Sequence, residues 1–396
     1  MPENISLKSH ILCLLIGSST LAAQAQPFDE VDINLETVGV VAPALQESGE
    51  AEVEPILGEI SLSARAERVL ESGLRIRLNG ALRTQYDNAL SAGTTRSFGE
   101  LAAAPAPFSG QAGGFSSGSD ELRTRLESAY VQIDGAYGEV RLGKDRGVAA
   151  RFFEGPPSAL RHARLDAPLL DPAGLSLIRT RHDLTGPSPK LSYASPRILG
   201  IRAGVSVTPD ASADGLDQRV GLDRGGLSGG LDEAYEVAVN ASRLLSSIDL
   251  RLEGMLAWSS ASIDPPSAGL SETYRDRVQS VSTGGRVRYK EWTLGATWAG
   301  SNDGLEDGEY ESWTLGVGRP AFGVDWTIGY GAAEDQRTGL DAESWRIGAA
   351  REFGDSARIS LGYLSDEGET PNFAAKASGV VLEVTLSTEI FSISGF

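Results

Sequence analysis

From residue 58 almost to the C terminus, the chain is built of segments of roughly ten residues in which apolar and polar side chains alternate. Because successive side chains of a β-strand point to opposite faces, each segment has one apolar and one polar face. The clearest example has apolar or small residues on one face, Ile248, Leu250, Leu252, Gly254, Leu256 and Trp258, and polar or smaller ones on the other, Asp249, Arg251, Glu253, Met255 and Ala257. Aromatic residues lie near segment ends, as in the girdles of barrels that face lipid. The repetition predicts an all-β fold, a closed transmembrane antiparallel β-barrel.

The segments can be paired into hairpins, which predicts about sixteen strands. Their ranges are 31–41, 58–69, 74–86, 121–134, 138–145, 188–195, 201–208, 233–243, 248–259, 276–289, 292–300, 309–318, 324–331, 341–351, 357–364 and 374–390. The first strand is brief, and the acidic stretch that continues to residue 57 also fits a periplasmic extension. In 121–134, Arg123 and Arg125 share a face with Val131, which a β-bulge or a position above the lipid would explain.

The connections between these segments alternate between short and long. The short ones cover 71–73, 135–137, 197–200, 243–247, 289–291, 319–323 and 352–356, and the long ones cover 88–120, 146–187, 209–231, 259–275, 301–308, 332–340 and 365–371. Barrels of the outer membrane have short periplasmic turns and longer external loops. The alternation therefore favours a barrel of that membrane.

The N terminus has the features of a secretory signal. Lys8 precedes the apolar run 11–23, and Ala23-Gln24-Ala25 fits a cleavage site after Ala25. Cys13 lies in the apolar run, so the mature chain would contain no cysteine and no disulfide. No later stretch approaches the ~20 apolar residues of a membrane-spanning helix. We therefore expect a signal peptide at 1–25, an N-terminal segment with a possible first strand at 26–57, and a barrel at 58–396.

The net charge of −19, without a basic stripe, argues against a nucleic-acid partner. The chain has no phosphate-binding loop, no Gly-x-Ser-x-Gly elbow and no His-Glu-x-x-His motif, so we expect no catalytic residues, no cofactor and no metal site. The acidic clusters Asp303, Glu306, Asp307 and Glu309, and Asp210, Asp214, Asp217 and Asp223, are more simply explained as solvated loops than as divalent cation sites. A secreted all-β adhesin or binding protein, with sheets packed as sandwiches, is the alternative to a channel.

The sequence SAYVQIDGAYGEVRLGKD at 128–145 resembles the strand-turn-strand unit that precedes the constriction loop of general bacterial outer-membrane porins. The signal-like N terminus, the long segment that follows, PKLSYASPRILGIRAGVSVTPD at 189–210 and the terminal Phe396 support the same resemblance over nearly the whole mature chain. It is greatest to the porins of alphaproteobacteria. The C terminus departs from the family, because Ser394, Ser392 and Thr388 stand where the assembly signal usually has apolar residues.

The resemblance implies a homotrimer of sixteen-stranded barrels, embedded in outer-membrane lipid and lipopolysaccharide. Each barrel would be a water-filled channel for passive diffusion of ions and small hydrophilic solutes, narrowed by its third external loop folding inward. Arg146 to Pro187 is the matching segment. Its Pro156-Pro157 and 172–174 are expected to form turns, and 158–165 a short helix.

Charged side chains inside a pore set its ion selectivity. Alternation places further arginines on the polar face, at Arg202, Arg251, Arg286, Arg346 and Arg358, and any wet barrel wall carries such scattered charges. Our candidates for the constriction are Arg65, Arg75, Arg77, Arg83 and Arg141 on the wall, and Glu154, Asp166, Asp171 and Asp183 on the loop.

Residues 146–187 contain six arginines and four acids, a balance of +2 that predicts weak anion preference. His162 and His182 fall in the same segment. They would act as a pH-sensitive gate or, more simply, as ordinary polar loop residues.

Overall fold

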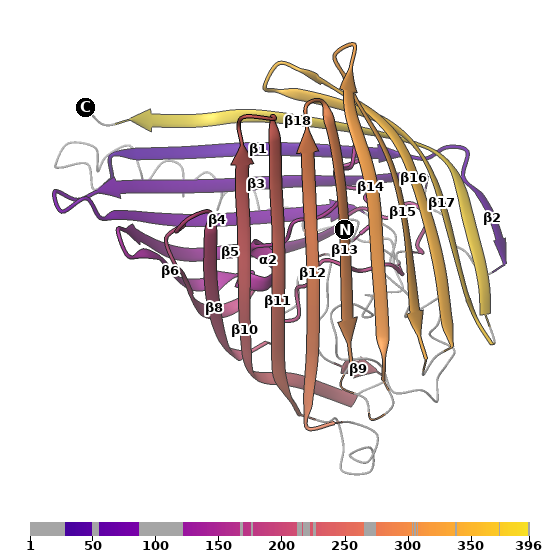
Figure 1. The fold of residues 1–396 in the computed structure, drawn as a ribbon, viewed down its shortest axis with the longest axis horizontal. Helices are drawn as coiled ribbons and strands as arrows, with labels where there is room; N and C mark the ends of the chain where they lie inside the picture. Colours follow the sequence, from indigo (N-terminus) through magenta and orange to yellow (C-terminus); the bar gives the residue numbers. More distant parts are fainter. Residues whose placement is uncertain are drawn as a thin grey trace, which may run out of the picture.

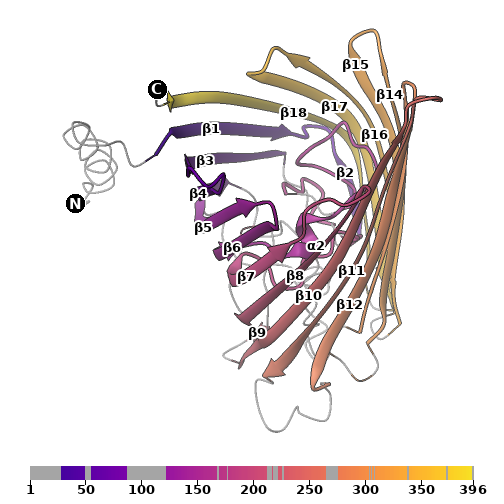
Figure 2. The same cartoon turned by 60° about the vertical axis from the view of Figure 1, so that its left-hand side comes forward.

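The computed structural model describes residues 28–49, 55–86, 122–166, 169–175, 177–211, 216, 222–224, 227–264, 275–302, 304, 306, 308–336, 339–371 and 373–394. Sixteen of the described strands form one closed antiparallel ring, as predicted (Figures 1 and 2). In ring order they are β1 (Glu30–Val41), β3 (Ile56–Val69), β4 (Arg75–Tyr86), β5 (Leu122–Gly135), β6 (Gly138–Asp145), β7 (Ser188–Ala194), β8 (Ile201–Asp210), β10 (Leu227–Leu245), β11 (Leu250–Asp264), β12 (Arg277–Tyr289), β13 (Trp292–Ser301), β14 (Tyr310–Ala321), β15 (Val324–Asp335), β16 (Leu340–Phe353), β17 (Ala357–Thr370) and β18 (Phe373–Ser394).

The ring closes at β1, which pairs with β3 on one side and with β18 on the other. Glu30 lies opposite Glu67 of β3 and opposite Ser394 of β18, so the two ends of the described chain meet at the same end of the ring. The first predicted strand is therefore part of the barrel, and residues 30–41 are not a periplasmic extension.

Two further short strands lie outside this ring of sixteen. β2 (Gln46–Gly49) pairs with residues 375–378 of β18, beyond the point where β1 ends. β9 (Leu222–Arg224) pairs with the first residues of β10. β2 supplies the hydrogen-bonding partner that the end of β18 would otherwise lack, which is a common way to protect an exposed sheet edge.

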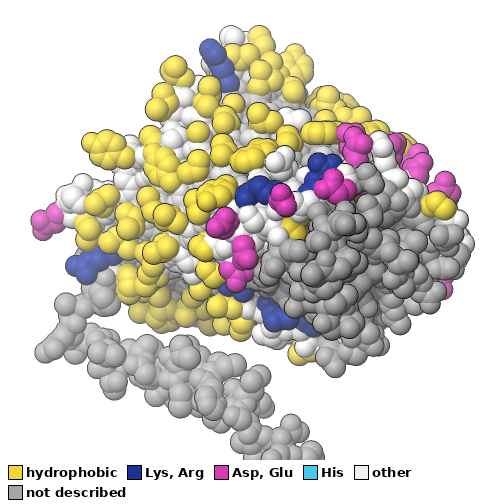
Figure 3. All heavy atoms as spheres, turned by 90° about the horizontal axis from the view of Figure 1, so that it is seen from below, with side chains coloured by type: hydrophobic (Ala, Val, Ile, Leu, Met, Phe, Trp, Pro, Cys, Tyr) yellow, Lys and Arg dark blue, Asp and Glu magenta, His cyan; other side chains and the backbone are white. Residues whose placement is uncertain are grey.

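The outer face of the ring carries mainly apolar side chains, whereas the surface of a water-soluble protein carries mainly polar ones. Large apolar side chains that point outward are 37–56 % exposed, among them Leu78, Leu82, Val131, Leu256, Trp258, Leu294, Trp313, Ile328 and Ile347. Figure 3 shows hydrophobic side chains over much of one view, with fewer charged side chains scattered among them. Among the described residues, no helix is long and apolar enough to span a membrane.

The inner face carries the alternate, mostly polar or small residues. On β12, Ser280 and Ser282 are buried, whereas Val287 on the outer face is exposed. On β5 the alternation shifts by one residue at a bulge, where Leu126 and Ser128 face consecutive residues of β4 and leave Glu127 without an opposite residue. The bulge lets Leu126 and Val131 both face outward, which explains the irregular pattern of this segment.

Four predicted long connections are shorter than expected, because strand pairing continues past the apolar band. In the first, 209–231, β8 continues to Asp210 and β10 begins at Leu227. β11 extends to Asp264, β15 to Asp335 and β17 to Thr370, so the predicted loops 259–275, 332–340 and 365–371 are partly or mostly strand. Above the lipid an outward side chain need not be apolar, and the cross-strand ion pair between Glu367 and Lys376, at 2.7 Å, replaces apolar contact there. The alternation signal therefore ends before the strand does.

The expected short helix is in a different place. Within the described part of the β6–β7 loop (residues 146–187), the helix is α2 (Val148–Arg151), and 158–165 is irregular. Val148 and Phe152 pack against small inward-facing residues, Ala194, Ala238 and Ala257. The backbone N–H groups of residues 161–163 bind a wall carboxylate, as described below, and this binding competes with helical hydrogen bonds.

Candidate functional site

The second half of the β6–β7 loop is hydrogen-bonded to the inner face of β13 and β14. The Tyr310 hydroxyl donates to the carbonyl oxygen of Leu177 at 2.8 Å and accepts from the backbone N–H of Arg179 at 3.0 Å. The Thr297 hydroxyl donates to the Thr180 hydroxyl at 2.8 Å. Because all of these groups are buried, each bond satisfies a polar group that would otherwise be costly to leave unpaired.

His182 continues this attachment onto β11 and β12. Its ring is fully buried, with Nδ1 3.0 Å from the Ser282 hydroxyl and Nε2 2.5 Å from the Ser259 hydroxyl. Burial lowers the pKa of His182 to about 4, so the ring is neutral at pH 7. A neutral imidazole has one donor and one acceptor, which two hydroxyl groups satisfy.

The first half of the loop is attached to β18 through the buried carboxylate of Glu383. This carboxylate accepts from the backbone N–H groups of Arg161 at 3.0 Å, His162 at 2.9 Å and Ala163 at 3.2 Å. Burial alone would lower the pKa of His162, but the hydrogen bond and charge of Glu383, 3.5 Å from Nδ1, raise it. A buried carboxylate on the wall therefore holds three consecutive residues of the loop.

Glycine residues of the wall let the loop approach closely. A Cβ atom at Gly295 would lie 2.8 Å from the Cα atom of Pro156, and one at Gly348 would lie 2.9 Å from the Cβ atom of Ala159. Distances below 3.0 Å would force the loop backbone away from the wall. The inner faces of β13 and β16 therefore accommodate this loop because they lack side chains at these positions.

Three of the predicted wall arginines gather around one carboxylate, near the short turn between β3 and β4. Arg65, Arg75 and Arg77 all pair with Glu67, the last two at 3.0 and 2.8 Å. Arg77 also contacts Asp134 at 2.9 Å. Their charge is thus shared with two carboxylates of the wall, and among the described residues none of their ion-pair partners lies in the β6–β7 loop.

Arg83 lies nearer the long loops and is buried. It binds Glu59 through two hydrogen bonds, and it lies 3.7 Å from Glu127 of the bulge. The adjacent inward residue Gln85 donates to Glu59 at 2.8 Å and to the carbonyl oxygen of Leu169 at 3.3 Å. This cluster connects β3 and β4 to the loop.

Arg141 belongs to a separate cluster on β6 and β8. It lies 2.7 Å from Glu139 and 2.8 Å from Asp145, and Glu139 also pairs with Arg151 of α2 and with Arg202 at 2.8 Å. Burial, followed by the charge of Arg141, lowers the pKa of Arg151. Three guanidinium groups thus converge on one buried carboxylate beside α2.

Two of the predicted loop acids are covered by arginines of the same loop. Asp166 pairs with Arg164 at 2.7 Å, and Asp183 pairs with Arg146. The carboxyl side chains are only 3 % and 5 % exposed, whereas the Arg164 and Arg146 side chains are 28 % and 22 % exposed. The positive groups therefore face water, and the negative groups lie behind them.

The other two loop acids differ from each other. Asp171 is buried and accepts from the backbone N–H of Ala173 at 3.1 Å, within a turn. Glu154 is partly exposed, 3.7 Å from Arg286 of β12, and accepts from Asn240 of β10 at 3.3 Å. Glu154 thus reaches across to a charged and a polar group of the wall.

Glu383 and Arg181 were not among the candidates from the sequence, and Arg286 was placed on the polar face without a role in holding the loop. Glu383 and Arg286 hold the loop backbone, the latter by donating to the carbonyl oxygen of Gly155 at 2.6 Å. Arg181 has a buried Nε without a hydrogen-bond partner among the described residues. Alternation placed Arg286 on the inner face, and inward parity would also have marked Glu383, but their loop partners, more than 130 positions away, leave no local signal.

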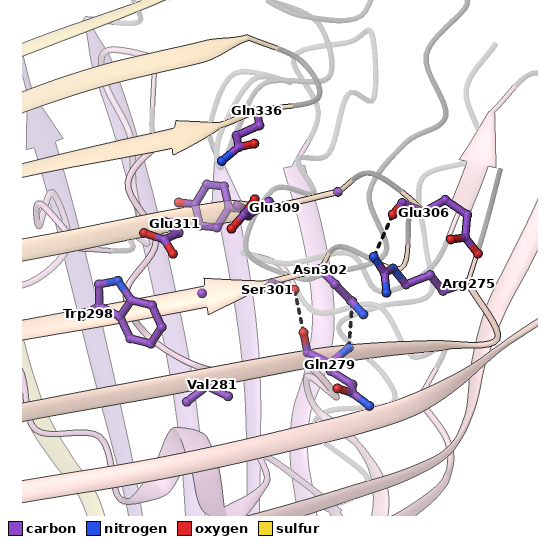
Figure 4. A pocket seen from close by; sticks show the side chains of 13 residues that line it. Arg275, Gln279, Val281, Trp298, Ser301, Asn302, Glu306, Glu309, Glu311 and Gln336 are labelled. Atoms are coloured by element: carbon purple, nitrogen blue, oxygen red, sulfur yellow. Dashed lines mark hydrogen bonds between the residues drawn. The ribbon is translucent and has the colours of Figure 1, made fainter.

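A separate cavity of about 670 Å³ lies outside the barrel wall, near the long-loop ends of β12, β13 and β14 (Figure 4). Val281 and Trp298, both outward-facing, form its apolar part, and Arg275, Glu309 and Glu311 are among its charged residues. It is distinct from the interior of the ring. Within the described residues, no group of three or more histidine or acidic side chains is arranged to hold a metal ion.

Comparisons with known proteins agree with this architecture. The family model of Gram-negative porins matches residues 13–371. No curated protein sequence matches the chain. The closed ring also differs from the packed sheets that the adhesin alternative requires.

Similar solved structures include OprB of Pseudomonas putida, with a TM-score of 0.58, 11 % identity, and coverage of 91 % of this chain and 94 % of that one. OmpF of Salmonella typhi has a TM-score of 0.56 and 11 % identity, covering 90 % and 97 %. An anion-selective porin of Comamonas acidovorans has a TM-score of 0.54 and 12 % identity, covering 91 % and 98 %. At these identities the likeness concerns the fold. With the family match over most of its length, the chain belongs to the Gram-negative porins and is a channel for passive diffusion across the outer membrane.

Proposed function

We propose that the β6–β7 loop folds into the channel as its third external loop and narrows the path for ions and small hydrophilic solutes. The attachment of the loop to inward-facing groups of the wall supports this proposal most directly. Tyr310, His182 and Glu383 take part in bonds that reach β11, β12, β14 and β18, which lie on both sides around the ring and at least three strands away from β6 and β7, the strands that the loop connects.

The channel is proposed to prefer anions weakly. The net charge of −19 argues for cations, but ions in a narrow zone respond mainly to side chains within the Debye length, about 8 Å at physiological salt. Around the loop the guanidinium groups of Arg146 and Arg164 are more exposed than their carboxylate partners. Two of the wall candidates are connected to the loop, Arg83 through its neighbour Gln85 and Arg141 through Glu139, which also pairs with Arg151.

Deleting residues 156–174 tests the proposed position of the loop. The strand pairing of the ring does not involve these residues, so the variant should assemble and its single-channel conductance should rise. The matched control deletes a similar length from 88–120, which connects β4 and β5. An assembled 156–174 variant with unchanged conductance would place the constriction elsewhere.

The assembly is proposed to be a homotrimer surrounded by outer-membrane lipid and lipopolysaccharide, exported through a signal peptide at 1–25. One structural relative, OmpT of Vibrio cholerae, is described in a trimer form, and its TM-score here is 0.52 at 11 % identity. The exposed apolar outer face requires lipid or a neighbouring subunit as its surroundings. The signal peptide and the loop 88–120, which could contact a neighbouring subunit, lie outside the described residues.

A further inference from the structure

Arg181 lies between two residues that are fixed to the barrel wall. Thr180 bonds to Thr297, and His182 bonds to two serine hydroxyls. The Arg181 side chain, unlike those of Thr180 and His182, makes no hydrogen bond to the wall among the described residues. The residue remains partly accessible to water. The backbone of Arg181 is therefore held against the inner face of the wall by both of its neighbours.

No carboxylate of the described residues lies within ion-pair distance of Arg181, and its buried Nε has no hydrogen-bond acceptor there. The charges that act on it most are those of Arg146, Asp183, Arg164 and Asp166. The two acids are already paired with the other two arginines. Arg146 also lies 3.7 Å from Glu127, so Arg146 and Arg164 both have carboxylate partners, whereas the positive charge of Arg181 has none among the described residues.

This charge persists at neutral pH. Burial, followed by the repulsion of Arg146, lowers the pKa of Arg181 to about 10, which still leaves the group protonated at pH 7. A buried guanidinium N–H without an acceptor is unfavourable, and an oxygen of a bound anion would satisfy it. A guanidinium fork matches two oxygens of one oxyanion better than it matches a single halide ion.

We propose that Arg181, with Arg146 and Arg164 beside it, forms a subsite that binds one small oxyanion, for which inorganic phosphate is the probe. The inference rests on the proposed function, because the anion must reach the loop through the channel. A solute held briefly at this subsite would be concentrated in the narrow zone, and it would compete there with chloride.

The test is a planar-bilayer recording of the purified full-length protein in potassium chloride, with increasing inorganic phosphate at pH 7. Phosphate should reduce the chloride current of the wild type reversibly and to saturation. In Arg181→Gln, which loses both the charge and the fork, the half-inhibiting concentration should rise about tenfold or more. Arg181→Lys keeps the charge and should lie between the two.

The matched control is Arg161→Gln, in the same loop. The Arg161 side chain is exposed and pairs with Glu352, which Arg358 also binds at 3.0 Å, so this substitution leaves no carboxylate alone. Phosphate inhibition in this control should equal that of the wild type. Each variant is first checked for a heat-dependent gel shift, which shows that the barrel has assembled. If Arg181→Gln fails to assemble, the half-inhibiting phosphate concentrations of the wild type and Arg181→Lys are compared instead.

The outcomes separate the two proposals. Absence of channels in every preparation would overturn the proposed function. Channels whose chloride current ignores phosphate, or that respond equally in the wild type and the Arg181 variants, would overturn the subsite alone.

Discussion

His182 and His162 attach one loop to one wall, but their pKa values shift in opposite directions. Burial lowers the pKa of His182 to about 4, whereas Glu383 outweighs burial and raises that of His162. Low pH weakens the attachment of a buried ring that is neutral in place, because protonation would put a charge there. Low pH strengthens the attachment of a ring beside a carboxylate, because the protonated ring is attracted to it. Both histidines are buried and attach the loop to the wall, so neither is an ordinary polar loop residue.

The first prediction concerns His182. The pKa of His182 is about 4 when its ring is buried against the wall and roughly 6.5 when the loop has detached and the ring is in water. Protonation below pH 6.5 therefore favours the detached loop. Each unit is worth about 1.4 kcal/mol, so acidification from pH 7 to pH 5 should weaken this attachment by about 2 kcal/mol. Hydrogen exchange of residues 177–183, corrected for the intrinsic pH dependence, should show reduced protection at pH 5.

His162→Gln is the control for this measurement, because the raised pKa of His162 contributes stability below pH 6.5 that is lost as pH rises. It should leave the acid effect at residues 177–183 in place. His182→Gln should remove it. Equal protection of the wild type at both pH values would show that the ring is not fixed as described.

Individual charged residues were predictable only in part. Alternation placed Arg77 and Arg83 on the inner face, because the two-residue period of a strand fixes the face of each side chain. It did not show that Arg77 shares Glu67 with two other arginines, nor that Arg181 lacks a carboxylate partner. Ion pairs join strands and loops that are far apart in the sequence. The composition therefore predicted the net charge of the loop but not which charged groups pair with one another.

At the scale of elements, the fit between wall and loop depends on glycine. Gly295→Ala should push Pro156 away from β13, because the new Cβ would lie within 3.4 Å of three backbone atoms of the loop. Overpacking of this kind costs about 1–3 kcal/mol. We expect faster proteolytic cleavage within the β6–β7 loop and an intact ring.

Gly39→Ala on β1 is the matched control, since nothing lies within 4 Å of the position a Cβ would take there. The protease should cleave the β6–β7 loop of this variant at the wild-type rate. If Gly295→Ala also behaves like the wild type, the close approach of Pro156 is not what holds this part of the loop.

Strand positions were predicted well within the apolar band and poorly above it. The range 248–258 was recognised because lipid requires apolar residues at every second position. β17 continues through Asp366, Glu367 and Glu369, where water replaces lipid and the alternation disappears although backbone pairing persists. The loop conformation left no periodic signal either, since it depends on distant groups such as Glu383.

At the scale of the whole molecule, closure of the ring and its apolar exterior determine how the protein should behave in detergent. With β1 paired on both sides, no strand of the ring is left with a long open edge, and barrels of this type resist unfolding until heated. The mature protein should fractionate with the outer membrane, and boiling should change its gel migration. Native mass measurement should give three chains, whereas a monomer alone would contradict the proposed trimer.

The most direct test of the account is the reversal potential of the purified protein in a planar bilayer across a potassium chloride gradient. The account predicts discrete current steps, as expected of an open water-filled channel, and a reversal potential displaced toward that of chloride, because arginines are the exposed charges of the β6–β7 loop. An absence of steps would contradict the channel itself. A reversal potential displaced toward potassium would contradict the proposed arrangement of charge.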